Sequence, residues 1–112
     1  MTTPATVQTE TLPVEETETK TRRQPPYAVI LHNDDHNTMQ FVVMVLRKVF
    51  GYTLEKCVEL MLEAHQKGRC VVWTGPLELA ELKADQIISC GADPDAVNGV
   101  AGPLRVTVEP VA

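Results

Sequence analysis

The most constraining feature of this sequence is a polar segment, residues 32–39 (HNDDHNTM), that separates two apolar runs. The runs on either side, residues 27–31 and 41–46, have the composition of buried elements. Two consecutive carboxylates beside an amide cannot cross an apolar core without partners, so the polar segment is expected to turn at the surface. Asn37 is a good helix N-cap, and Gln40 stands where a capping box has its Glu or Gln. The sequence therefore predicts a strand, an acidic turn and a helix.

Two amphipathic segments after this turn predict helices. The first runs from about Thr38 to Phe50 and ends at Gly51, and the second follows the cap Thr53 and ends at Gly68. The apolar faces expected to pack inward are Met39, Val42, Val43, Leu46 and Val49/Phe50 on the first helix, and Leu54, Cys57, Val58, Met61 and Leu62 on the second. His65 continues the second face and is expected where that face meets the rim.

The remaining elements complete a small α+β domain. Residues 27–32, 69–73 and 103–109 read as strands, and a third helix opens at residues 74–76 with a proline in its first turn. Residues 91–102 form a loop rich in Gly, Pro and Asp. The order β-α-α-β-α-β predicts a three-stranded antiparallel sheet packed against three helices.

The first part of the chain has a different composition from the rest. Residues 1–24 are rich in Thr, Glu and Pro, with no aromatic residue and no periodicity, which is typical of a disordered tail. Pro25-Pro26 then marks a stiff boundary. We therefore expect two regions, a disordered N-terminal tail at residues 1–24 and one folded domain at residues 25–112.

Charge, hydropathy and cysteine content exclude several classes of protein. A net charge of −5, without a basic cluster, argues against nucleic-acid binding. We also expect neither a membrane span nor a signal peptide, because the apolar runs are short and the N-terminus is polar. Cys57, Cys70 and Cys90 are too few and too widely spaced for a disulfide framework or a zinc ribbon. They are expected to be buried, reduced thiols in a cytoplasmic protein.

If the first two helices pack side by side, their side chains and the acidic turn surround one pocket. Asn and Asp before a helix are often simply turn formers, and Met at helical spacing is often core, so this alternative stays open. The pocket would have an acidic, amide-bearing lip and aliphatic walls, formed by Asn33, Asp34, Asp35, Met39, Val42, Met61, Ala64 and His65.

A metal site and a catalytic site are the other possible interpretations of these residues. His32, His36 and His65 lie near carboxylates but show no HExxH motif and no Cys/His pairing. Ser89 is the sole serine and falls in an apolar stretch, and a Cys70 nucleophile would need an unsupported tertiary contact. We expect no catalytic residue, no metal and no cofactor. A small metal- or metabolite-binding domain is the alternative.

Four segments follow one another in this sequence: PPYAVILHNDDHNTMQFV, LMLEAHQKGRCVVWTG, LELAELK and GPLRVTVEP. Through these segments the chain closely resembles, over about residues 25–110, the ClpS family of adaptor proteins. Members of this family recognise proteins by a destabilising N-terminal residue (an N-degron) and deliver them to the Clp protease. The resemblance implies an adaptor without enzymatic activity, whose partners are substrate N-terminal peptides and the N-domain of a Clp AAA+ unfoldase.

The resemblance also implies roles for individual residues. Asn33, Asp34 and His65, with the neighbouring Asp35, would surround the substrate α-ammonium. Glu78 and Lys83 match positions that touch the unfoldase N-domain, and the tail resembles an extension that engages the unfoldase. The pocket for the first side chain would be shaped by Asp35, Asn37, Met39, Val42, Met61, Ala64 and Leu104.

Three positions depart from the best-known members of the family. Asn37 stands where threonine is common, and Thr38 where proline is common. Ala64 replaces a bulkier aliphatic residue, which leaves room in or beside the pocket. The preferred first residue therefore stays open among Leu, Phe, Tyr and Trp.

Overall fold

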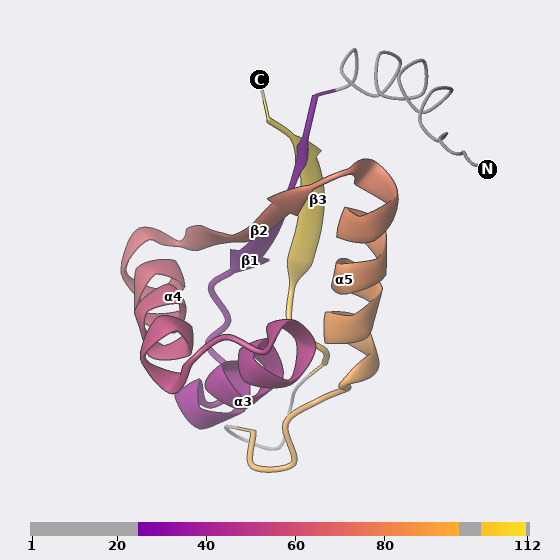
Figure 1. Ribbon diagram of the computed structural model, residues 1–112. Coiled ribbons are helices and arrows are strands. Elements are labelled where there is room, and N and C mark those ends of the chain that lie inside the picture. Colours follow the sequence, from indigo (N-terminus) through magenta and orange to yellow (C-terminus); the bar gives the residue numbers. More distant parts are fainter. Residues whose placement is uncertain (1–24, 97–101, 112) are drawn as a thin grey trace, which may run out of the picture.

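The computed structural model describes residues 25–96 and 102–111 (Figure 1). The elements in chain order are β1 (Tyr27–His32), α3 (Met39–Phe50), α4 (Leu54–Lys67), β2 (Arg69–Gly75), α5 (Leu77–Ser89) and β3 (Val106–Pro110). The predicted β-α-α-β-α-β order is confirmed, although β3 begins later than expected. The predicted tail and residues 97–101 of the predicted loop lie outside the described residues. The division into tail and domain therefore stays a prediction.

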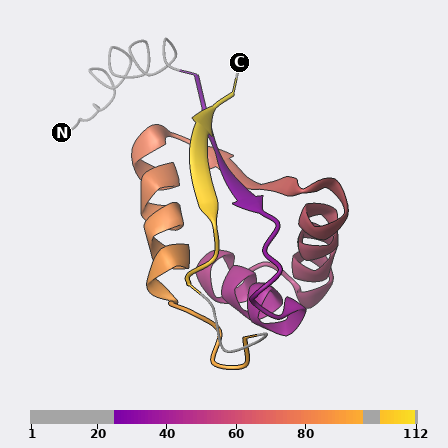
Figure 2. The same ribbon diagram turned by 180° about the vertical axis from the view of Figure 1, so that it is seen from behind.

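β1 is the central strand of a three-stranded antiparallel sheet with the order β2-β1-β3. Its four middle residues, Ala28 to Leu31, are all buried. α4 and α5 pack against the sheet, and α3 packs against α4 and α5 at one end of it (Figure 1). Figure 2 shows the sheet from behind, with β3 in front. The predicted α+β fold is thus confirmed, and the turn after β1 leads into α3.

The start of α3 differs from the prediction. Thr38 is its N-cap, and the Thr38 side chain accepts a hydrogen bond from the N–H of Phe41 at 3.2 Å. The predicted cap at Asn37 and its capping box with Gln40 are therefore wrong. Threonine can also cap a helix, so the start moves by one residue. The shift leaves the Asn37 side chain available for other contacts.

The other helix ends follow local signals in the sequence. Gly51 and Gly68 end α3 and α4 with φ angles of 71° and 90°, the left-handed region that glycine adopts without strain. Thr53 caps α4 as predicted and accepts a hydrogen bond from Lys56 N–H. Pro76 is the residue before α5 rather than part of its first turn. β2 accordingly continues to Gly75, beyond the predicted end.

The buried faces of α3 and α4 are rotated from the predicted ones. Met39, Leu54 and Leu62 were expected inside, but they are 44%, 50% and 38% exposed. His65, which was expected at the rim of the second face, is exposed. Both helices carry more apolar residues than one buried stripe needs, so periodicity alone does not decide which edge faces the core. The residues that the structure buries are Phe41, Val42, Val45 and Leu46 on α3, and Cys57, Leu60, Met61 and Ala64 on α4.

The three cysteines are free thiols. Cys57 and Cys70 are buried as predicted, whereas Cys90 is half-buried. Burial raises the pKa of the Cys70 thiol to about 11, so this thiol stays protonated at neutral pH and is a poor nucleophile. Among the described helices, none has both the length and the apolar composition that crossing a bilayer requires.

Candidate functional site

The turn that follows β1 is organised by the carboxylate of Asp34. Asp34 Oδ1 accepts hydrogen bonds from the N–H of His36 at 2.7 Å and of Asn37 at 3.3 Å. Asp34 Oδ2 accepts a third hydrogen bond, from Asn37 Nδ2. Burial by itself raises the pKa of Asp34, but these three donors outweigh it and lower the pKa below its usual value. Asp34 is therefore both a turn former and a fixed negative charge.

Asn37 connects this turn to the chain between α5 and β3. Its side chain is 6% exposed. Besides Asp34, it donates to the carbonyl oxygen of Gly102 at 3.2 Å, and its Oδ1 accepts from the N–H of Asp93 at 3.0 Å. The Asp93 carboxylate in turn accepts from Thr38 N–H at 2.7 Å and from Thr38 Oγ1 at 2.6 Å. The turn is thus held from two sides, which keeps the Asp34 carboxylate in place.

We expect acid to weaken this network. Hydrogen bonds from Thr38 hold the pKa of Asp93 below its usual value despite burial, and the pKa of Asp34 is also lowered. Because both pKa values are depressed in the folded state, the two ionised carboxylates stabilise the fold fully above the unfolded-state pKa of about 3.9. This stabilisation is lost as pH falls through the lower folded-state pKa values.

Urea unfolding at pH 7, 5, 4 and 3 measures this effect. The Asp93→Asn variant cannot lose a charge at position 93, so its free energy of unfolding should fall less between pH 5 and pH 3 than that of the natural protein. Equal losses in the two proteins would show that Asp93 does not contribute to the acid sensitivity.

Backbone contacts bring the last turn of α4 beside the acidic turn. The N–H of Asn33 donates to the carbonyl oxygen of Gly68 at 3.0 Å, immediately after α4 ends. His65 lies in that last turn and is exposed. Within the described part of the chain the His65 side chain has no hydrogen-bond partner, so both ring nitrogens are available. Asn33 Nδ2 makes one weak contact, 3.5 Å from Asp35 Oδ1, and leaves its own amide oxygen available.

These residues surround a small cavity of about 30 Å³. It has room for about one or two water molecules. Its mouth is polar, and its inner wall is made by α3 and α4. The lining residues are Leu31, His32, Asn33, Asp34, Asn37, Met39, Val42, Met61, Ala64 and His65. The structure therefore brings together eight of the ten residues that the sequence analysis assigns to the substrate N-terminus and its side-chain pocket.

The other two residues lie elsewhere, and two unexpected residues join the cavity. Asp35 is exposed on the turn, and Leu104 is 2% exposed within the hydrophobic core. Leu31 and His32, at the end of β1, were not predicted to line the cavity. The His32 ring lies 2.8 Å from Thr107 Oγ1 on β3. Burial, aided by Arg105 and Arg69, lowers the pKa of His32 and so favours its neutral form.

A metal centre has no ready site in this region. In residues 25–96 and 102–111, no group of three or more His, Cys, Asp or Glu side chains is placed to hold a metal ion. His32 faces Thr107, and the Asp34 carboxylate faces backbone and amide donors. The acceptor groups at the cavity mouth instead suit an ammonium group, which needs several oxygen or nitrogen acceptors and one negative charge.

Glu78 and Lys83 lie on α5, outside the cavity. Glu78 is exposed in the first turn of the helix. Lys83 is half-buried, and its Nζ donates to the carbonyl oxygen of Val49 at 3.3 Å and lies 5.7 Å from the centre of the Phe50 ring. Lys83 therefore holds α5 against the end of α3, and Glu78 is the more accessible of the two to a partner.

Comparisons with known proteins find one family of similar proteins. Residues 22–107 match the family described as ATP-dependent Clp protease adaptor protein ClpS. A protein of that name from Synechococcus sp. is 44% identical over 85 residues, which cover 75% of this chain and 93% of the relative. Another, from Ruegeria sp., is 39% identical over 93 residues, covering 83% of this chain and 77% of the relative.

A solved structure has the same fold. It is described as Agrobacterium tumefaciens ClpS2 bound to L-phenylalaninamide. The TM-score is 0.68 and the sequence identity 32%, and the match covers 80% of this chain and all of that one. Because the family match spans most of the chain and the fold agrees, the chain belongs to the ClpS family of adaptor proteins of the ATP-dependent Clp protease.

Proposed function

We propose that this protein binds the free N-terminal residue of substrate proteins, when that residue is bulky and hydrophobic, and delivers these substrates to a Clp AAA+ unfoldase and its protease. The family makes the chain an adaptor of the Clp protease rather than a protease itself. The observation that carries the proposal is the set of acceptors Asn33, Asp34 and His65 at the mouth of one apolar cavity. The related ClpS2 binds L-phenylalaninamide, which has a free α-amino group and an aromatic side chain.

The acceptors at the mouth fit an α-ammonium group. A carboxylate has about four acceptor positions, and the turn uses three of those on Asp34. One position and the full negative charge are therefore left for a ligand. Asn33 offers its amide oxygen, and His65 offers a ring nitrogen. Three acceptors and one anion match the three N–H donors and the single charge of an α-ammonium.

The same arrangement excludes internal peptide segments. A peptide bond has one N–H and no charge, so it would leave two of the acceptors desolvated and without a partner. Each unsatisfied group costs about 1–3 kcal/mol, more where it is charged. This penalty provides selectivity for a chain terminus without any contact to the rest of the substrate.

The apolar walls account for the requirement for a bulky first residue. Burial of a Leu or Phe side chain contributes about 1.5–3 kcal/mol. A cavity of about 30 Å³ is too small for such a side chain, so a wall must move when the substrate enters. Met39 is 44% exposed, and methionine is unbranched and adaptable. We propose that Met39 swings outward and then covers the first side chain, while the buried Ala64 leaves space beside it.

Met39 is expected to decide which side chains enter. It lies on the first turn of α3, where it can contact the Cβ atom of the first substrate residue. Side chains branched at Cβ should clash with it, so Met39→Ala should admit Val and Ile, raising their affinity about fivefold or more relative to Leu. Fluorescence anisotropy with peptides that differ only at the first residue measures these ratios. Met44→Ala, an exposed methionine of the same helix outside the cavity, serves as the control.

Unchanged Leu, Ile and Val ratios in the Met39→Ala protein would contradict this role. Met39 would then act only as surface cover for the core, which is the alternative that the sequence left open.

Delivery to the unfoldase is proposed to use α5 and the tail. Glu78 is exposed and does not line the cavity. We propose that Glu78 and Lys83 contact the unfoldase N-domain, and that residues 1–24 engage the unfoldase once the domain has docked. The composition of residues 1–24 suits an extended segment rather than a packed one.

Glu78→Lys should therefore separate binding from delivery. The variant should bind a Leu-first peptide as the natural protein does but should slow degradation of a Leu-first substrate by a reconstituted Clp unfoldase and protease several-fold. Glu81→Lys, the same change at another exposed position of α5, is the matched control. Full-speed degradation with Glu78→Lys would rule out this contact, whereas loss of peptide binding would mean that Glu78 belongs to the cavity side of the molecule.

A further inference from the structure

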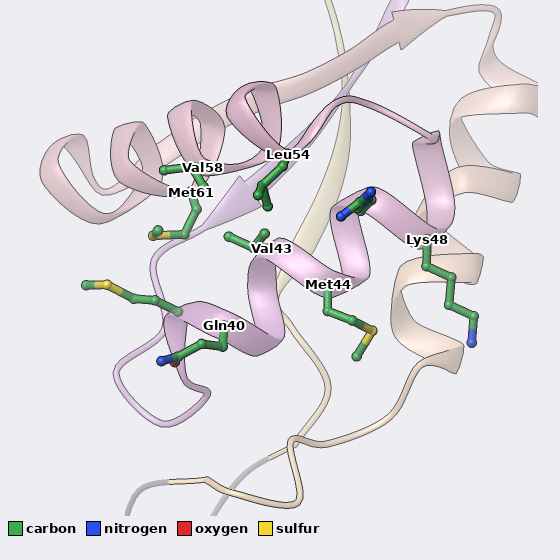
Figure 3. Close-up of a pocket in the computed structure, with 9 residues that line it drawn as sticks. Gln40, Val43, Met44, Lys48, Leu54, Val58 and Met61 are labelled. Atoms are coloured by element: carbon green, nitrogen blue, oxygen red, sulfur yellow. The ribbon is translucent and has the colours of Figure 1, made fainter.

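A second, larger hollow lies between α3 and α4. Its volume is about 690 Å³. In Figure 3, Leu54, Val58 and Met61 of α4 stand on one side, and Val43 of α3 stands opposite them. We call this hollow the α3/α4 groove. Its lining residues are Met39, Gln40, Val43, Met44, Arg47, Lys48, Leu54, Val58 and Met61.

Three exposed apolar side chains gather around the groove. Met39, Met44 and Leu54 are 44%, 48% and 50% exposed. Grouped apolar side chains of this size on a small protein are typical of a binding surface. Helical periodicity alone places Met39 and Leu54 inside, because the two helices have more apolar residues than the core uses. The groove therefore offers an apolar floor that nothing in the described part of the chain covers.

The charge of the groove is opposite to that of the protein. The lining contains Arg47 and Lys48 and no carboxylate, whereas the chain has a net charge of −5. Ion pairs in the described residues join Lys56 to Glu59 and Arg69 to Glu109, and neither Arg47 nor Lys48 takes part in one. Both cations suit the C-terminal end of α3 through the helix dipole. That interaction does not explain why they border an apolar groove.

The groove is continuous with the cavity at the acidic turn. Met39 and Met61 line both. Met39 and Gln40 begin α3 beside the cavity, and Arg47 and Lys48 lie in its last turn, so the groove leads from the cavity toward the two cations. A chain whose first residue sits in the cavity can continue into the groove past Met39.

We propose that the α3/α4 groove holds the part of the substrate that follows its first residue, and that it favours apolar residues followed by Asp or Glu. This inference rests on the proposed binding of a substrate N-terminus in the cavity. Eight helical positions separate Met39 from Arg47, which is about 12 Å at 1.5 Å per residue. An extended peptide covers that distance in about four residues at roughly 3.3 Å each. The acidic residues should therefore be most effective at about positions 5 and 6 of the substrate.

Peptides with a common N-terminus test the inference. All begin with Leu and carry apolar residues at positions 2–4, and positions 5 and 6 are Glu-Glu, Ser-Ser or Lys-Lys. Leucinamide has no residue after the first, so it should occupy the cavity but not the groove. At low salt the Glu-Glu peptide should bind about five- to tenfold more tightly than the Lys-Lys peptide, and 0.5 M salt should remove most of the difference.

Three variants locate the effect. Arg47→Glu should reverse the order of the Glu-Glu and Lys-Lys peptides and leave leucinamide affinity unchanged. Lys56→Glu makes the same change of charge on the exposed first turn of α4, outside the groove, and should preserve the order. Leu54→Asn should weaken all long peptides several-fold without affecting leucinamide, because it removes apolar floor and leaves the cavity intact.

The outcomes separate this inference from the proposed function. If leucinamide and every free-amine peptide failed to bind, the proposed function itself would be wrong. If they bound with affinities that did not depend on positions 5 and 6, and Arg47→Glu left the affinity of every peptide unchanged, the groove would have no role in substrate binding. A dimer in sedimentation that Leu54→Asn dissociates would make a second copy of the chain the occupant, and would also overturn the inference.

Discussion

Replacing Asp34 by asparagine is expected to weaken binding of a Leu-first peptide by roughly 30- to 150-fold, which is about 2–3 kcal/mol. The reason is the loss of the single anion that is proposed to pair with the substrate ammonium. Asparagine keeps one oxygen that can accept from the N–H groups of His36 and Asn37, so the turn should persist. Alanine is a poorer choice, because it removes all three hydrogen bonds that Asp34 accepts and disturbs the turn itself.

Asp35→Asn is the matched control for this prediction. It removes the same charge one residue away, from an exposed side chain that does not line the cavity. It should weaken peptide binding only a few-fold, because a nearby negative charge that attracts the ammonium is lost. Anisotropy measures both affinities, and thermal unfolding checks that both variants fold. A folded Asp34→Asn protein that bound like the natural one would remove Asp34 from the proposed ammonium site.

Asn37→Ala is expected to destabilise the domain by about 2–3 kcal/mol and to weaken peptide binding at the same time. Asn37 is buried, and its side chain satisfies the N–H of Asp93 and the carbonyl oxygen of Gly102. Removal leaves the buried Asp93 N–H without its acceptor and takes one donor from Asp34. An unsatisfied buried group costs about 1–3 kcal/mol. Urea unfolding measures the stability loss.

Asn33→Ala provides the contrast. The Asn33 side chain makes only a weak contact with Asp35, so its loss should change the free energy of unfolding by less than about 0.5 kcal/mol. It should nevertheless weaken peptide binding, because its amide oxygen is a proposed acceptor. The pair of variants thus separates holding the turn from contacting the substrate. If Asn37→Ala left both stability and affinity intact, the network around Asp34 would have no part in positioning the site.

The sequence predicts the order of the elements because strong local signals mark their ends. Gly51 and Gly68 end the first two helices, and Thr53 caps the second. The acidic segment after β1 cannot be buried without partners, so its place at the surface also follows from local chemistry. Most of the cavity is predictable for the same reason, since the turn and the two helices that follow it are close in sequence.

The features that the sequence does not predict depend on contacts between distant segments. Asn37 resembles a helix cap, yet it is buried because Asp93 and Gly102, which are 56 and 65 residues further along the chain, contact it. The role of Asp93 in holding Thr38 has no local signal at all. Periodicity also does not predict which sides of α3 and α4 are exposed, because Met39 and Leu54 are as apolar as the residues in the core.

The most direct test of the proposed function uses a set of peptides that differ only at the first residue. Each peptide is measured with a free and with an acetylated N-terminus. We predict that Leu-, Phe-, Tyr- or Trp-first peptides with a free amine bind with micromolar-class affinity, as the balance between two or three polar contacts and one buried side chain indicates. Acetylation of the same peptides should abolish measurable binding, and Gly- or Asp-first peptides should not bind in either form. Equal affinity for the free and acetylated forms would contradict recognition of a substrate N-terminus by Asn33, Asp34 and His65.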